Sequence, residues 1–353
     1  MNVSLIEFFI TKNKTTIFVI DTQKPGSINE PWRISIDITE KEIRAAKALI
    51  WSFSKNPVVQ QCSIDHFQQI GFRLLKPVLD YINPCDVLYI VPHKDLHYFP
   101  FYAVEIDGRT LCEQFAIIYL PNASLLQYCK ANNAVRENEN FLFNKILTLG
   151  VGVKEDSRVN QKKFKQEAES ILEIFDTNSI DIYTGVNATK RRFIKKAEKY
   201  DLIHIASHGH FSSVAPLSSG LLLACGRNLP SLTALDNLSN HTLNADEFYR
   251  LKLKANLVVL NGCFTGRNDI RPGDELMGLT RGLFIAGVPT MMLSLWEAHH
   301  DAAICFMKCF YTELKKGYPK AIAYQAAQNH LRQQPGFSEI KYWAPFILLG
   351  DWL

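Results

Sequence analysis

The sequence predicts an α/β protein whose second half is built on a largely parallel sheet. In that half, short apolar runs typical of buried strands alternate with longer segments of helical periodicity, which is the pattern of parallel strands covered by helices on both faces. The chain of 353 residues is also longer than one ordinary domain. A polar segment at 130–140, with four asparagines, predicts the connection between a domain at 1–140 and a domain at 141–353.

Both domains are expected to be mixed α/β. In the first, apolar runs predict strands at 8–20 and 86–91, and apolar residues at helical spacing predict helices at 40–54 and 64–81. The second domain continues the alternation. Its expected strands lie at 145–153, 181–183, 201–207, 256–262 and 288–295, and its expected helices at 161–175, 188–199, 275–285, 302–316 and 319–332. A last apolar stretch follows at 343–349.

Composition narrows the function classes. The net charge of +4 is small and no basic stretch is interleaved with aromatic residues, so nucleic acid is not expected as a direct partner. The first residues carry Glu7 and no basic leader, and the uncharged run at 282–296 is broken by Gly287 and Pro289. No signal peptide and no membrane segment are therefore expected. Eight cysteines without a Cys-x-x-Cys pair favour free thiols and a cytoplasmic location.

Two strand ends carry residues with catalytic chemistry. The expected strand at 201–207 runs directly into His208 and Gly209, and the strand at 256–262 is followed at once by Cys263. Adjacent parallel strands end at the same edge of a sheet, where sites form beyond the carboxyl ends. Cys263 and His208 are therefore expected to face one cleft.

Cysteine proteolysis needs a thiolate, an imidazole that later protonates the leaving amine, and donors for the oxyanion. We predict Cys263 as the nucleophile, His208 as the proton carrier, and the backbone N–H groups of Gly209 and Cys263 as the oxyanion donors. The histidine lies 55 residues upstream of the cysteine. This order is opposite to that of papain-like enzymes and matches caspases, where the spacing is roughly 50 residues.

With these motifs, the half from about residue 145 to residue 353 resembles the CHAT family of caspase-like peptidases, which is related to separase and more distantly to caspases. The stretches that carry the resemblance are HIASHG at 204–209, LVVLNGC at 257–263, GDELMGLTR at 273–281, AGVP at 286–289, SLW at 294–296, WAPF at 343–346 and GD at 350–351. LYIVPH at 88–93, LHYFPF at 96–101 and YLPNAS at 119–124 resemble the segment that precedes the catalytic half in the same family.

The resemblance implies a caspase-like, mostly parallel sheet flanked by helices in 141–353, preceded by a smaller, inactive caspase-like half in 1–140. It assigns the catalytic histidine to His208 and the nucleophile to Cys263, with no cofactor. It also implies a cysteine endopeptidase that cleaves a protein partner through a thioester. Such enzymes act in bacterial defence or cell-death circuits, where a sensor or regulatory protein activates the enzyme and a substrate such as a gasdermin-like pore former is released.

Several alternatives remain open at this stage. Glu297 and Asp301 either pair with a basic substrate residue in front of the cut or lie as surface carboxylates at the start of the next helix. The alternative to a peptidase is a non-catalytic caspase-fold adaptor that docks other proteins. His204, inside an apolar strand, is predicted to be a buried core histidine.

No metal or nucleotide site is expected. His93 and His97 lie in a turn bracketed by prolines, which does not suit a zinc site on a helix. Gly150 and Gly152 follow a strand but lack the third glycine of a dinucleotide-binding loop.

Overall fold

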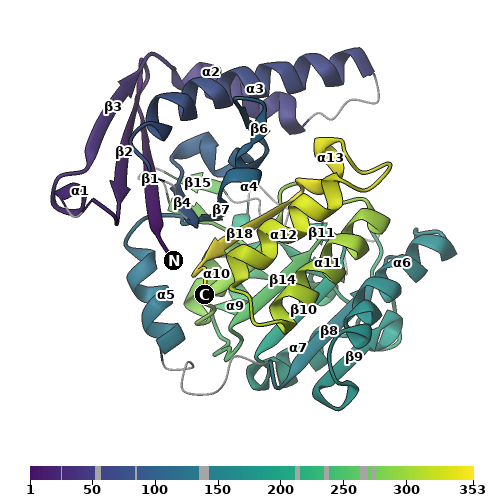
Figure 1. The fold of residues 1–353 in the computed structure, drawn as a ribbon. Coiled ribbons are helices and arrows are strands. Elements are labelled where there is room, and N and C mark those ends of the chain that lie inside the picture. The colour runs from purple at the N-terminus through teal and green to yellow at the C-terminus, as the bar shows by residue number, and fades with distance from the viewer. Residues whose placement is uncertain are drawn as a thin grey trace. The chain divides into compact units, whose positions relative to one another are not determined.

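The computed structural model describes residues 1–24, 26–51, 57–83, 86–134, 143–210, 215–233, 238–262, 269–271 and 275–353 (Figure 1). These residues form two compact units. Unit 1 comprises Met1–Leu126 with Trp352, and unit 2 comprises Gln127–Asp351 with Leu353. The boundary expected between residues 140 and 141 lies outside the described residues.

Five described strands of unit 1 lie side by side in the order β3 (Trp32–Ile36), β2 (Thr15–Asp21), β1 (Val3–Ile10), β4 (Val87–Val91) and β7 (Ala116–Tyr119). The strands β1, β4 and β7 are parallel, whereas β2 runs antiparallel to both of its neighbours, β1 and β3. The single strand predicted at 8–20 was wrong, because the chain turns back between β1 and β2. The backbone N–H of Thr11 donates to the Lys14 carbonyl at 2.9 Å, which closes this turn.

The helices predicted in the first half are confirmed as α2 (Glu40–Trp51) and α3 (Pro57–Leu79), which pack against each other. Thr39 and Glu42 cap α2 reciprocally, since the Thr39 N–H donates to the Glu42 carboxylate at 2.8 Å and the Glu42 N–H donates to Oγ1 of Thr39 at 3.3 Å. Short elements fill the space between the strands. They are α1 (Gly26–Asn29), η1 (Lys94–Tyr98), η2 (Phe101–Ala103), β5 (Glu105–Ile106), β6 (Arg109–Thr110) and α4 (Leu111–Gln114).

Six described strands of unit 2 lie side by side in one sheet and confirm the predicted fold class. Their order is β18 (Phe346–Gly350), β17 (Thr290–Ser294), β14 (Leu257–Asn261), β10 (Leu202–Ser207), β8 (Ile146–Val151) and β9 (Ile180–Thr184). All neighbours are parallel except β18, which runs antiparallel to β17. Every residue of β8, β10, β14 and β17 is buried, which explains why these strands appear in the sequence as unbroken apolar runs.

Helices cover both faces of the unit 2 sheet because successive strands are added first toward one edge of the sheet and then toward the other. It passes from β8 through α6 (Arg158–Glu169) outward to β9, then through α7 (Lys190–Lys196) back to β10. Right-handed crossovers in opposite directions place these two helices on opposite faces. The helix α11 (His300–Lys315) packs against α6 and α12 (Lys320–Arg332), and Figure 1 shows these three helices in front of the strands.

The helix predicted at 275–285 begins later than expected. Residues Glu275–Met277 form β16, which pairs with β15 (Asp269–Arg271), and α10 (Leu279–Ile285) follows. A small sheet of β11 (Gly209–His210), β12 (Gly220–Leu222) and β13 (Thr242–Asn244) was not predicted. The remaining described helices are α5 (Leu125–Ala134), α8 (Leu238–His241), α9 (Ala245–Phe248) and α13 (Ile340–Trp343), with 3₁₀ turns at η3 (Ser170–Glu173), η4 (Thr177–Ser179), η5 (Gly185–Asn187), η6 (Ala197–Lys199) and η7 (Pro216–Ser218). Across the described parts of the chain, we find no helix that is long and apolar enough to cross a membrane.

Candidate active site

The ends of β10 and β14 meet at one edge of the unit 2 sheet, as the sequence predicts. The two strands pair in register from Leu202 with Leu257 to Ala206 with Asn261. Gly262, the next residue, fits tightly between neighbouring segments. A Cβ atom at this position would lie 2.6 Å from the Ser207 carbonyl oxygen and 3.2 Å from the Gly209 nitrogen. The residue that precedes Cys263 in sequence therefore packs against the backbone on both sides of His208.

Cys263 itself lies outside the described residues, since the segment 263–268 is not described. Its roles as nucleophile and as an oxyanion donor stay predictions. The structure does show how the chain arrives there. The carbonyl of Gly262 accepts a hydrogen bond from the Ser294 hydroxyl on β17, and the side chain of Asn261 bonds to α6.

His208 pairs with a carboxylate that the sequence reasoning missed. Its Nε2 lies 2.9 Å from Oδ2 and 3.1 Å from Oδ1 of Asp156, and the two side chains are 19% and 9% exposed. Because a carboxylate can only accept, Nε2 carries the hydrogen of this bond. Nδ1 has no hydrogen-bond partner among the described residues and is the nitrogen open to a thiol proton.

Asp156 is held by the turn between β8 and α6. Its Oδ2 accepts the N–H of Val153 at 2.8 Å, and Ser157, the next residue, caps α6 by accepting the N–H of Asn160 at 3.1 Å. A Cβ atom on Gly152 would lie 2.5 Å from Oδ2 of Asp156, so a larger residue at this position would displace the carboxylate from its present place. Gly152, which is not part of a dinucleotide-binding loop, thus leaves room for the Asp156 carboxylate. The sequence signal that could have identified Asp156 was a carboxylate just beyond the end of a buried strand.

The neighbouring Glu155 faces the other way and fixes a second segment. It accepts hydrogen bonds from the hydroxyl of Ser231, from the Leu232 N–H at 3.2 Å and from the hydroxyl of Thr233 at 3.0 Å. These bonds, with that of Ser231 the largest cause, lower the pKa of Glu155 to about 2. One turn therefore supplies carboxylates to His208 and to the segment 231–233.

A phenylalanine lies between His208 and a second imidazole. The Phe164 ring centroid is 5.0 Å from that of His208 and 4.7 Å from that of His300, which begins α11. Burial is the main cause that lowers the pKa of His300 below 6.5, with the nearby His208 acting in the same direction. His300 is therefore an uncharged neighbour at neutral pH.

The backbone N–H of Gly209, predicted as an oxyanion donor, does not bond to the neighbouring strand β12. In β11 and β12, Gly209 pairs with Leu221, and the Leu222 N–H donates to the His208 carbonyl at 2.9 Å. Antiparallel pairs alternate between bonded and non-bonded, so the pair of Gly209 and Leu221 forms no ladder bonds. The N–H of Gly209 therefore points away from β12, and its nitrogen is close to Gly262.

The two carboxylates predicted for a substrate pocket differ in their surroundings. Asp301 forms an ion pair with Lys163 of α6, and this hydrogen bond is the main cause that lowers its pKa. Glu297 is exposed and has no ion pair among the described residues. The role of either residue in substrate recognition stays a prediction, with Asp301 already compensated by a cation.

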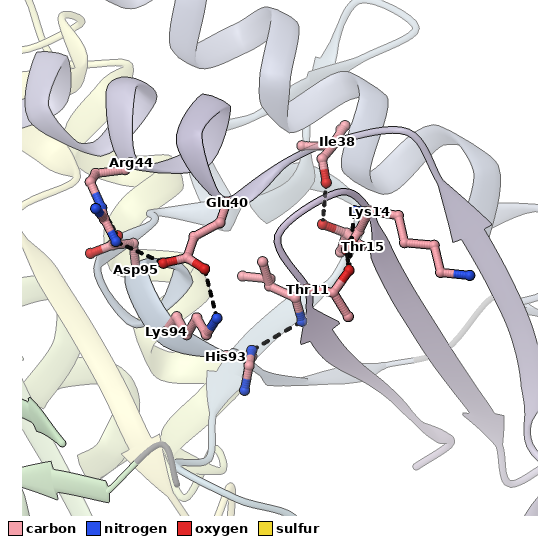
Figure 2. Close-up of polar contacts among 10 residues, drawn as sticks. Thr11, Lys14, Thr15, Ile38, Glu40, Arg44, His93, Lys94 and Asp95 are labelled. Carbon is pink, nitrogen blue, oxygen red and sulfur yellow. Dashed lines mark hydrogen bonds and ion pairs between the residues drawn. The ribbon is translucent and has the colours of Figure 1, made fainter. Parts of the chain in front are cut away.

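Within the described part of the chain, no group of three His, Cys, Asp or Glu side chains is arranged to hold a metal ion. His93 instead accepts the backbone N–H of Ile10 through Nδ1 at 3.0 Å, as Figure 2 shows. His204 is fully buried, as predicted, and its Nδ1 lies 2.7 Å from the hydroxyl of Tyr311.

The fold and these strand ends define a caspase-like cysteine peptidase architecture. A family model of the CHAT domain matches residues 65–351, so the chain belongs to the CHAT-domain family. No curated protein sequence matches.

Solved structures of caspase-like cysteine peptidases share the fold. The separase of the Saccharomyces cerevisiae separase–securin complex is similar with a TM-score of 0.59 at 10% identity, over 99% of this chain and 30% of that chain. The Arg-specific cysteine proteinase gingipain R is similar with a TM-score of 0.51 at 9% identity, over 82% of this chain and 67% of that chain. The present chain thus spans about 30% of the separase chain.

Proposed function

We propose that the chain is a cysteine endopeptidase in which Cys263 is the nucleophile and His208 transfers the proton. The observation that supports this most is the pairing of His208 with Asp156 at 2.9 Å, beside the strand end that leads into Cys263. The carboxylate orients the imidazole and leaves Nδ1 for chemistry. The same arrangement gives no advantage to an adaptor that only docks proteins.

In the proposed first step, Nδ1 of His208 takes the thiol proton of Cys263, and the sulfur attacks the carbonyl carbon of the scissile peptide. The carbonyl oxygen becomes an oxyanion that accepts hydrogen bonds from the N–H groups of Gly209 and Cys263. Asp156 compensates the positive charge of the imidazolium at this stage. The C–N bond then breaks, His208 gives its proton to the leaving amine, and a thioester remains.

In the second step, His208 takes a proton from a water molecule whose oxygen attacks the thioester carbonyl. The C–S bond breaks, the proton returns to the sulfur of Cys263, and the product leaves as a carboxylic acid. Phe164 covers one side of the His208 ring and limits its rotation. No cofactor takes part in these steps.

The proposed substrate is a protein cut after a basic residue. Glu297 is the exposed carboxylate beyond the end of β17 and is the better placed of the two candidates, because Asp301 already pairs with Lys163. A role in bacterial defence or cell death follows from the CHAT resemblance. In that role, a sensor protein activates the enzyme, and the cut partner, for example a gasdermin-like pore former, carries out the response.

The test combines turnover with thiol labelling. A fluorogenic peptide library that varies the residue before the cut is compared between the unmodified chain and Cys263→Ala, and Cys263 is labelled with a peptidyl chloromethyl ketone. Background labelling comes from the exposed Cys62 and Cys225, so both are replaced by serine. Burial raises the pKa of Cys129 to about 12 and that of Cys309 to about 11, which keeps both thiols protonated and slow to react.

Turnover after Arg or Lys that disappears in Cys263→Ala supports the proposal in full. Labelling of Cys263 that is lost in His208→Ala, without turnover of small peptides, supports a peptidase that needs its activator. Absence of both turnover and selective labelling contradicts the proposal and favours the adaptor. Loss of preference for basic residues in Glu297→Gln tests the assignment of the pocket.

A further inference from the structure

Four buried polar side chains of unit 2 contact one another in a chain. Glu167 of α6, His204 of β10 and Tyr311 of α11 are each 0% exposed, and Asn261 at the end of β14 is 7% exposed. They come from four different elements of unit 2. We call these four residues the buried polar cluster.

One carboxylate oxygen contacts two members of the cluster, and Tyr311 joins through Nδ1 of His204. Nδ2 of Asn261 donates to Oε1 of Glu167 at 2.7 Å, and Nε2 of His204 lies 3.3 Å from the same oxygen. Burial, and secondly the charge of Glu167, raises the pKa of Tyr311 well above its usual range, so the phenol keeps its proton. Glu167 therefore holds β14 by a charge-assisted hydrogen bond and faces β10 through His204.

The cluster stands next to the proposed catalytic residues in sequence. Asn261 is the second residue before Cys263, and His204 is the fourth before His208. Phe164, which packs on His208, lies on the same helix one turn before Glu167. Since Ser294 holds the Gly262 carbonyl from β17, the chain that leads into the nucleophile is held by side chains from two elements.

Stability alone does not account for a carboxylate in this place. Burying a charged group is unfavourable, and apolar residues of similar size are often at least as stable. Oε2 of Glu167 also has no hydrogen-bond partner within the described ranges, so the carboxylate is only partly compensated. The carboxylate instead fixes the orientation of the Asn261 side chain, because its amide donates to Glu167 in one orientation.

We infer that Glu167 and Asn261 are positioning residues that hold the end of β14 so that Cys263 faces His208. This inference rests on the proposed function. It concerns neither substrate contacts nor the proton carrier, since both residues are buried. The expected signature is a loss of kcat with little change of KM.

The test reverses the hydrogen bond. Asn261→Asp replaces the donor by a second carboxyl group opposite Glu167. Close carboxyl groups share a proton at low pH, so kcat is measured at alkaline pH, where both groups are ionised and repel each other. We expect kcat to fall about 100-fold, as displacements of about 1 Å do. Adding Glu167→Gln again pairs one amide with one carboxylate, but residue 167 now donates and residue 261 accepts. We expect the double variant to have a kcat at least about 10-fold higher than that of Asn261→Asp.

Gln328→Glu is the matched control. Gln328 of α12 is another buried amide, 1% exposed, whose Nε2 lies 3.0 Å from the Tyr324 hydroxyl. The same change from amide to carboxylate there lowers the melting temperature without a selective loss of kcat. Glu167→Gln alone, which keeps an acceptor oxygen and adds no charge, serves if Asn261→Asp does not fold, and lowers kcat by about 10-fold.

Equal kcat losses in Asn261→Asp and Gln328→Glu would overturn the inference, as would a double variant that folds but recovers nothing. In the fallback, wild-type kcat in Glu167→Gln would overturn it as well. Failure of the proposed function looks different. In that case the unmodified chain has no turnover, and Cys263 reacts no faster than Cys62 and Cys225.

Discussion

In each unit a histidine follows the end of a buried parallel strand. The two histidines differ in their hydrogen bonds, because one ring accepts a hydrogen and the other donates one. In unit 1, His93 follows β4 and accepts the Ile10 N–H through Nδ1 at 3.0 Å (Figure 2). In unit 2, His208 follows β10 and donates from Nε2 to Asp156 at 2.9 Å. One ring uses a lone pair to join two segments, and the other gives a hydrogen to a carboxylate.

The difference shows what turns a strand end into a candidate catalytic site. An imidazole nitrogen that accepts a backbone N–H must lose that bond before it takes up a proton. A ring that donates to a carboxylate keeps its second nitrogen for a thiol, and the carboxylate compensates the charge of the protonated ring. Both histidines follow a strand, so that position alone does not mark a catalytic histidine. The distinguishing feature is a carboxylate that accepts a hydrogen bond from the imidazole N–H.

Replacing the two histidines tests this comparison most directly. His208→Ala removes the proposed proton carrier, and we expect kcat/KM to fall up to about 10⁴-fold. His93→Ala removes the hydrogen bond to the Ile10 N–H and the ring contact with Phe9, and we expect a loss of at least about 1 kcal/mol in the free energy of unfolding with activity nearly unchanged. Peptide turnover and urea unfolding of both variants measure this. Similar activity losses in the two variants would remove the distinction between the histidines.

The carboxylate itself is the next target. Asp156→Asn presents an amide that can donate to Nε2 and so favours the wrong ring tautomer, and we expect kcat to fall about 10³-fold with KM little changed. Asp181→Asn on β9 is the control, because Asp181 bonds to Lys196 at 2.9 Å and has no contact with His208. Steady-state kinetics of both variants decide it, and equal activity of the two would show that Asp156 does not assist His208.

Close packing at the strand end gives a smaller effect. Gly262→Ala would place a methyl group 2.6 Å from the Ser207 carbonyl oxygen. We expect about 1–3 kcal/mol of destabilisation from overpacking and a roughly 100-fold loss of kcat from displacement. Gly26→Ala in unit 1 is the control, since nothing lies within 4 Å of a Cβ there. Thermal unfolding and turnover are measured for both, and an unimpaired Gly262→Ala would contradict the tight contact.

The smallest effect concerns His300, the imidazole on the other side of Phe164 from His208. Burial lowers the pKa of His300 from 6.5 in the folded protein. As pH falls below 6.5, the unfolded chain binds a proton at this residue before the folded protein does, so the free energy of unfolding decreases. His300→Gln lacks this contribution. Melting temperatures between pH 7.5 and 5.5 should therefore fall less in the variant, and parallel curves would argue against a buried neutral His300.

The sequence was informative where both faces of a strand are buried. The strands β8, β10, β14 and β17 form unbroken apolar runs, so their positions and their common edge could be predicted. The small sheet of β11, β12 and β13 has strands of two or three residues, too short to show any periodicity. Of the adjacent Glu155 and Asp156, only the geometry of the turn decides which one meets His208.

The non-bonded pair of Gly209 and Leu221 makes one amide hydrogen a natural reporter. Amides in bonded pairs of a sheet exchange slowly with deuterium, whereas the Gly209 amide has no ladder partner among the described strands and should exchange quickly in the free protein. An aldehyde inhibitor that forms a tetrahedral adduct on Cys263 would place its oxyanion before this amide. Slower deuterium exchange of the Gly209 amide alone, followed through its single NMR resonance, would then report formation of the tetrahedral adduct.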